Sequence, residues 1–281
     1  MDFETKYINK DIKISEFTGS SYKTEAMFED HLLVWFISGE TKIIQAEATY
    51  HFKADDIFLI SRNHLATIIN YSKEGNSHKA VAMHLTKERL KNYYSRHKPG
   101  TRGKSIRSIY LFSKHKLLES CMASLVPYFD LGEDLPAEIA DIKIEEAITI
   151  VRSIDKNMDS VLANFDEPGK IDLADFMERN FMFNMTFTKF GYLTGRSLST
   201  FRRDFKKTFN STPQKWLTKK RLELAHYQIA EKQQKPVDVC WEVGFENLSH
   251  FSYAFKSHFG YPPQSLIARP KVNFEHFSTA P

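Results

Sequence analysis

Polar and basic side chains recur at helical spacing in two segments of the carboxyl-terminal half. The two sets are Ser199, Arg202, Arg203 and Lys206, and then Asn247, Ser249, His250, Tyr253 and Lys256. Side chains three or four positions apart share one face of an α-helix. Arginine binds phosphates and guanine edges, while serine, histidine and tyrosine suit phosphates or the methyl edge of thymine. These sets predict two helices that bind nucleic acid; the alternative is a pair of polar faces that contact only solvent.

The two segments are copies of one unit. Within residues 198–214, eight positions are identical to those fifty residues later, including the phenylalanines at 201, 205 and 209. Such a repeat indicates a duplicated supersecondary unit. Each copy predicts a short helix, a glycine turn at Gly195 or Gly244, and a longer helix whose phenylalanines form its buried side. A helix over 213–231 would separate the copies by roughly 28 Å, close to the ~34 Å between major-groove faces on one side of B-DNA.

Basic residues are concentrated in the same half of the chain. Residues 170–281 hold 17 lysines and arginines against 10 acids, whereas the preceding residues hold 22 against 25. Between Thr186 and Arg221 there are ten basic residues and one acid. This asymmetry favours a polyanionic partner over a lysine-rich helix that is merely solvated.

The amino-terminal half predicts strands followed by helices. Short apolar runs at 34–37, 42–45, 57–60, 66–69 and 80–83 are separated by turn residues and are typical of a barrel or sandwich. From Lys87 the pattern becomes helical, and Pro168-Gly169 marks a linker. The fold class is therefore α+β, with an amino-terminal β-barrel domain over 1–165 and an all-α domain with two helix-turn-helix units over 170–270.

An apolar stripe between residues 135 and 165 requires a partner surface. Its members recur at steps of three or four residues: Ile144, Ile148, Val151, Ile154 and Met158. The stripe predicts either packing within its own domain or the interface of a homodimer.

Two aromatic side chains, Trp35 and Phe36, lie in the first of the apolar runs. Neighbouring strand residues face opposite sides, so one of the two should point into the barrel, where it would line a small ligand pocket or fill the core. The histidines are scattered without a His-x-His pair, so no metal ligands are expected. The chain also lacks a glycine-rich phosphate loop, a serine elbow and a His-Glu-x-x-His motif, so we expect no cofactor and no catalytic residue.

Several features favour a cytoplasmic protein. The longest apolar run has six residues, far fewer than the ~20 of a membrane span, and Met1-Asp2-Phe3-Glu4 does not resemble a signal peptide. The two cysteines are too few for a disulfide scaffold.

Residues 170–270 resemble the DNA-binding domain of the AraC/XylS family of bacterial transcription regulators. The resemblance rests on residues 237–245, Ser249-His250-Phe251, Phe255-Lys256, Gly260 and Pro263, and in the first unit on residues 199–202, Phe205-Lys206, Pro213 and Arg221-Leu222. The sequence departs from the family pattern at Cys240, Gly191 and Leu266-Ile267. The resemblance implies an activator that binds double-stranded promoter DNA and works with RNA polymerase.

The amino-terminal half resembles, through residues 31–39 and 54–60, the cupin-like sensor of such regulators. Residues 142–146 are similar to the subgroup that contains the activator of type III secretion in pseudomonads. The resemblance implies an effector at the sensor domain and leaves open whether it is a small molecule or a protein. The leading hypothesis is a DNA-binding transcription regulator with a sensor and dimerisation domain. The alternative is a cupin-type enzyme or small-molecule carrier with an incidental basic tail.

Overall fold

The computed structural model describes residues 2–72, 77–100, 107–112, 114–131 and 136–267. Its contacts divide the chain into two compact units. The first comprises residues 1–171 together with 188–197, and the second comprises residues 172–187 and those from Leu198 onward. The division after residue 171 lies near the predicted linker, whereas the grouping of residues 188–197 with the first unit was not predicted.

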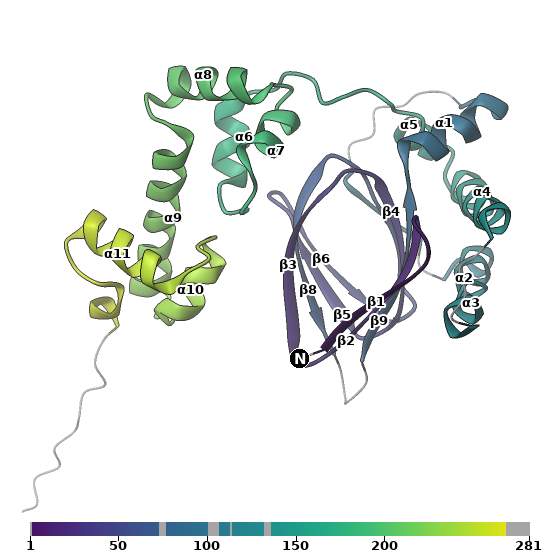
Figure 1. Cartoon of the computed structure of the whole chain (residues 1–281), viewed down its shortest axis with the longest axis horizontal. Coiled ribbons are helices and arrows are strands. Elements are labelled where there is room, and N and C mark those ends of the chain that lie inside the picture. Colours follow the sequence, from purple (N-terminus) through teal and green to yellow (C-terminus); the bar gives the residue numbers. More distant parts are fainter. Residues whose placement is uncertain (1, 73–76, 101–106, 113, 132–135, 268–281) are drawn as a thin grey trace, which may run out of the picture. The chain divides into compact units, whose positions relative to one another are not determined.

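The first unit contains two antiparallel sheets (Figure 1). The strands are β1 Asp2–Asn9, β2 Ile12–Thr18, β3 Ser21–Phe28, β4 His31–Ser38, β5 Glu40–Ile44, β6 Thr49–Lys53, β7 Ile57–Ile60, β8 His64–Tyr71, β9 His78–Leu85 and β10 Ile109–Leu111. One sheet has the order β1-β2-β9-β4-β7-β10 and the other β3-β8-β5-β6. The predicted β-domain is confirmed, but among the described residues its strands form two sheets in place of one closed barrel.

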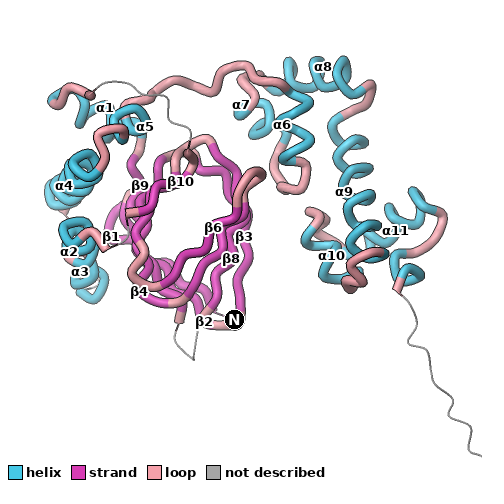
Figure 2. The backbone as a smooth tube through the Cα atoms, turned by 180° about the vertical axis from the view of Figure 1, so that it is seen from behind, coloured by secondary structure: helices cyan, strands magenta, loops and turns pink. Residues whose placement is uncertain are grey.

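Aromatic side chains fill the space between the sheets. Figure 2 shows the strands around a common interior, and Phe36, Phe52 and Phe58 are buried there. The rings of Phe52 and Phe58 stack with centroids 3.9 Å apart, and Phe36 lies 5.3 Å from Phe58. Phe36 therefore belongs to a filled core, which is one of the two alternatives, filled core or ligand pocket, that the sequence left open.

A helical layer covers the other face of the six-stranded sheet. Its helices are α1 Lys87–Arg96, α2 Lys116–Ala123, α3 Val126–Leu131, α4 Ala137–Ile154 and α5 Met158–Leu162. Leu33 and Trp35 of β4 point into this layer, opposite to Phe36, because consecutive strand residues alternate in direction. Trp35 therefore does not line the space between the sheets, which corrects its assignment to a ligand pocket there.

The apolar stripe of α4 and α5 packs inside its own domain. Ile144, Ile148, Val151 and Met158 are at most 1% exposed, and Ile154 is partly buried against the same core. These side chains face the sheet and present no surface to a second copy. The stripe is explained by intradomain packing, so its five residues are corrected from dimer contacts to core residues.

Two buried histidines are held neutral inside the first unit. Burial, followed by the nearby Arg62 and His64, lowers the pKa of His31 to about 3, and burial lowers the pKa of His78 to about 4. The backbone N–H of Arg62 donates to His31 Nδ1 over 3.3 Å, and His78 Nε2 lies 2.7 Å from Thr41 Oγ1. Both rings are 3% exposed or less.

Acid is expected to destabilise this unit between about pH 6.5 and pH 4. The unfolded chain binds protons at His31 and His78 in this window and the folded chain does not, so stability falls as the pH is lowered. Each histidine contributes a loss of up to about 1.4 kcal/mol for each pH unit. Urea unfolding from about pH 7 to about pH 4 would measure the slope. Because other groups also titrate, His31→Gln and His78→Gln serve as variants; an unchanged slope in both would contradict the prediction.

The second repeat and most of the first belong to the second unit. The helices of the carboxyl-terminal half are α6 Leu173–Asn180, α7 Phe187–Leu193, α8 Leu198–Phe209, α9 Pro213–Ala230, α10 Pro236–Glu242 and α11 Leu248–Phe259, and a 3-10 turn spans Pro263–Leu266. The two long repeat helices, α8 and α11, follow Gly195 and Gly244 as predicted. None of the described helices is both long and apolar enough to cross a membrane.

Candidate nucleic-acid interface

The buried side of α8 is aromatic. Phe201 and Phe205 are fully buried. The ring of Phe205 lies 5.5 Å from that of Phe201 and 4.4 Å from that of Phe209, and it meets Trp216 of α9 edge-on at 5.6 Å. Residues 201, 205 and 209 lie on one side because four residues advance a helix by just over one turn. These contacts orient α8 and leave its polar side outward.

The exposed side of α8 is strongly basic. Ser199, Arg202, Arg203 and Lys206 are all exposed, as predicted, and so is Lys207. Arg203 lies 3.3 Å from the carboxylate of Asp204, whereas no described residue forms an ion pair or hydrogen bond with Arg202. A guanidinium with its donors free can bind a phosphate or two acceptors of one base.

The second repeat helix, α11, has the same construction. Phe251 and Phe255 are fully buried, with ring centroids 5.7 Å apart, and Phe259 lies 4.6 Å from Phe255. The residues on the opposite side are exposed, namely Ser249, His250, Tyr253 and Lys256. The structure thus brings both predicted polar sets to helix surfaces. Their contact with nucleic acid is a prediction.

Local signals in the sequence position α11. Gly244 and Gly260 have φ values of +84° and +87°, which a residue with a Cβ adopts at a cost. Asn247 caps the helix, since its Oδ1 accepts the backbone N–H of His250 over 3.0 Å. Asn247 was predicted as a nucleic-acid contact; its side chain is exposed, and that contact stays a prediction.

Arg221 of α9 joins the two ends of the second unit. Its guanidinium donates to the backbone oxygens of Phe181, Phe183 and Gly244 over 3.1, 2.9 and 2.9 Å. In the sequence, Arg221 stood out only as part of a family motif. Its hydrogen bonds could not be predicted, because the three carbonyl groups that accept them lie far from it in the sequence. It fixes the turn before α11 from the middle of α9.

The helix α9 sets the spacing of the two long repeat helices, α8 and α11 (Figure 1). It has 18 residues and therefore spans roughly 27 Å at ~1.5 Å per residue. Trp216 near its start packs on α8, while His226 near its end stacks on Phe255 of α11 with centroids 6.1 Å apart. The single helix α9 therefore packs against both helices that have the exposed polar faces.

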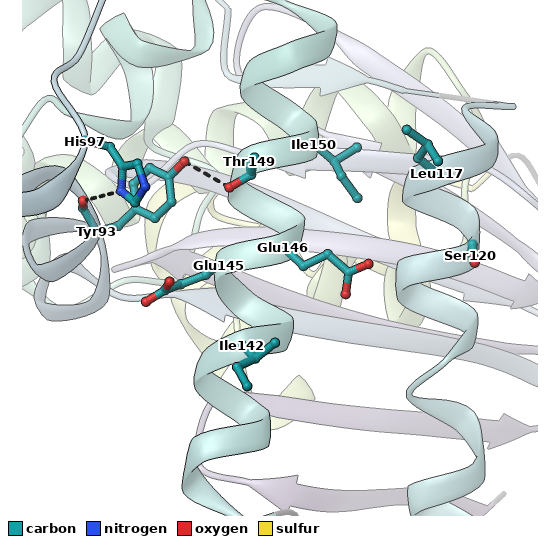
Figure 3. Close-up of a pocket in the computed structure, with 9 residues that line it drawn as sticks. All are labelled: Tyr93, His97, Leu117, Ser120, Ile142, Glu145, Glu146, Thr149 and Ile150. Atoms are coloured by element: carbon teal, nitrogen blue, oxygen red, sulfur yellow. Dashed lines mark hydrogen bonds between the residues drawn. The ribbon is translucent and has the colours of Figure 1, made fainter.

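A second surface feature lies on the helical layer of the first unit (Figure 3). An open groove of about 530 Å³ runs between α1, α2 and α4 and is lined by Tyr93, His97, Leu117, Ser120, Ile142, Glu145, Glu146, Thr149 and Ile150. Leu117 and Ile142 are 62% and 64% exposed. The groove was not predicted from the sequence. Its apolar residues lie among polar residues of α2 and α4 and do not recur at a regular spacing. Among the residues that the structure covers, no three His, Cys, Asp or Glu side chains gather as metal ligands would.

Two family models match separate parts of the chain. One is a helix-turn-helix domain over residues 193–269, and the other is the ExsA N-terminal regulatory domain over residues 31–162. The first covers α8, α9, α10 and α11. The second covers β4 to β10 and the helices α1 to α5.

Individual proteins are also similar to parts of this chain. The chain is 24% identical over 157 residues to the virulence regulon transcriptional activator VirF of Yersinia enterocolitica, and 26% identical over 157 residues to the HTH-type transcriptional regulator ExsA of Pseudomonas aeruginosa. Each match covers 55% of this chain and 58% or 56% of the relative, so the chain spans a little over half the length of these proteins. A crystal structure of an apo single-site variant of ToxT from Vibrio cholerae is 12% identical, with a TM-score of 0.46 over 93% of this chain and 98% of that one.

Proposed function

We propose, on the premise that this chain belongs to the AraC family, that it is a transcription activator that binds promoter DNA in the cytoplasm. The observation that carries the proposal is the recurrence, on α8 and α11, of an exposed polar face opposite a buried phenylalanine core. The name of the relative VirF as a transcriptional activator supports the sign of regulation, and an activator would have RNA polymerase as its partner. The domains are a cupin-like sensor over 1–165 and a DNA-binding domain over 170–270.

Arg202→Ala is expected to weaken binding to a selected duplex by roughly 1–3 kcal/mol and to relax the preference at one base pair. The side chain is exposed, so stability should change by less than about 0.5 kcal/mol. The measurement is a fluorescence-anisotropy titration of the full chain with duplexes changed one base pair at a time. Arg179→Ala on α6, an exposed arginine paired with Asp175, is the matched control. Equal losses for the two variants would contradict a base contact by Arg202.

The filled interior of the sheet domain favours a protein effector. Phe36, Phe52 and Phe58 occupy the space where a small molecule would bind between the sheets. The relatedness of residues 31–162 to the ExsA N-terminal regulatory domain supports a regulatory role for this domain. We therefore propose that a protein, in place of a small molecule, binds the outer surface of this domain.

The homodimer is proposed to form through the groove on α2 and α4. Leu117 and Ile142 expose apolar surface beside Glu145 and Glu146, which pair with Arg96 and Lys143. A two-fold contact brings one patch against itself, so it favours a patch that carries apolar side chains together with both charges.

Leu117→Glu combined with Ile142→Glu is expected to give a folded monomer, since the change buries unpaired charge in the interface but disturbs no core side chain. Analytical ultracentrifugation measures the mass, and circular dichroism measures the fold. Leu111→Glu on β10, 59% exposed and outside the groove, is the matched control and should remain dimeric. A folded dimer of the double variant would place the interface elsewhere.

A further inference from the structure

The internal repeat allows the two long repeat helices, α8 and α11, to be compared position by position. A shift of fifty residues places Ser252 and Tyr253 where α8 has Arg202 and Arg203, and Ser257 where it has Lys207. Lys206 is the only one of the four basic residues of α8 whose counterpart in α11, Lys256, is also a lysine or arginine. α8 therefore carries four basic residues and one acid, whereas α11 carries one lysine and no acid. The two polar faces share a scaffold but differ in chemistry.

The face of α8 is suited to acceptor groups. Arg202 is exposed, and no described side chain or carbonyl accepts its donors. Guanine presents two acceptors, N7 and O6, in the major groove, and an arginine fork can bind both at once. The neighbouring Lys206 and Lys207 are exposed and can neutralise phosphates on either side.

The face of α11 is suited to an apolar contact. Tyr253 is 76% exposed, the largest exposed fraction among the described large hydrophobic side chains. It lies at the centre of the polar set, four residues after Ser249 and three before Lys256. The adjacent His250 is held by the cap of Asn247 and by a ring contact with Phe245 at 5.7 Å. An exposed aromatic ring suits the 5-methyl group of thymine, which is the apolar feature of the major groove.

We propose that the two helices read bases by different chemistry, α8 through guanine acceptors bound by Arg202 and α11 through thymine methyl groups contacted by Tyr253. The inference rests on the proposed DNA-binding function. It assigns a guanine-containing half-site to the first repeat and a thymine-containing half-site to the second.

Base analogues in a selected duplex test this assignment. The full-length chain is first used to select binders from random duplexes of about 30 base pairs, roughly three helical turns. In the best duplex, each thymine is replaced singly by deoxyuridine, which removes only the methyl group, and each guanine by 7-deazaguanine, which removes N7. We expect uracil to weaken binding about four-fold at one thymine or more, and 7-deazaguanine to weaken it on the order of ten-fold at one guanine or more.

Variants connect each effect to its side chain. Tyr253→Ala should abolish the uracil effect and leave the 7-deazaguanine effect, while Arg202→Ala should do the reverse. Tyr253→Phe should keep the uracil effect, because the ring and not the hydroxyl makes the contact.

Two failures are distinguishable. If the folded chain selects no duplex, the proposed function is wrong. If it selects a duplex but uracil is tolerated at every thymine, or Tyr253→Phe binds as weakly as Tyr253→Ala, then DNA binding stands and the assignment of thymine to α11 is wrong. Loss of the 7-deazaguanine effect in Tyr253→Ala would likewise overturn it.

Discussion

Phe205→Ala is expected to destabilise the second unit by about 3–5 kcal/mol, a large part of the roughly 5–15 kcal/mol that stabilises an ordinary domain. Phe205 is fully buried, and its ring contacts Phe201, Phe209 and Trp216. Truncation removes these contacts and leaves a cavity that α9 cannot fill without moving. Chemical denaturation followed by circular dichroism measures the loss.

The repeat supplies a second, matched test. Phe255→Ala removes the equivalent side chain of α11, which contacts Phe251, Phe259 and His226, and should cost a similar amount. Arg202→Ala, at an exposed position of α8, should leave the unfolding curve in place. An unstable Arg202→Ala together with a stable Phe205→Ala would mean that the buried and exposed faces of α8 are reversed.

The helical half could be predicted closely because its signals are local. The phenylalanine period marks the buried side of α8 and α11, and the turn residues Gly195, Gly244 and Gly260 mark their ends. The exposure of the nine proposed contact residues follows from the same periodicity. Arg221 escaped prediction because its role depends on three carbonyls brought together only by folding.

The amino-terminal half was predicted less completely for physical reasons. Strands β1, β2 and β3 contain charged residues and no apolar run longer than Ala26-Met27-Phe28, so the sequence indicates them only weakly. The apolar stripe of α4 could be found from its period, but periodicity does not say which surface covers it. In this chain the six-stranded sheet covers the apolar stripe of α4. Leu117 and Ile142 lie outside the stripe, and their side chains are exposed on the helical layer.

Trp35 and Phe36 show the same limit of a local pattern. Alternation along β4 required that one of them face the other sheet, and the sequence could not choose between them. The structure places Phe36 between the sheets and Trp35 under the helices.

The second large effect concerns salt. Basic side chains on α8 and α11 that neutralise phosphates release counterions, so the logarithm of affinity should fall linearly with the logarithm of salt concentration. The basic residues expected to contact phosphates are Arg203, Lys206, Lys207 and Lys256. With the phosphate contacts that a second copy adds in a dimer, about six or more phosphates are neutralised. The loss of affinity between about 50 mM and about 200 mM salt is then on the order of a thousand-fold or more. Lys206→Ala should reduce the slope by about one, whereas the exposed Lys235→Ala, before α10, should not.

The most direct test of DNA binding by these two helices is the salt dependence of duplex binding by the full-length chain, with and without Lys206→Ala. We predict steep salt dependence and a shallower slope in the Lys206 variant, with the Lys235 variant unchanged. A folded chain that binds no duplex at about 50 mM salt, or whose affinity does not depend on salt, would contradict DNA binding by α8 and α11.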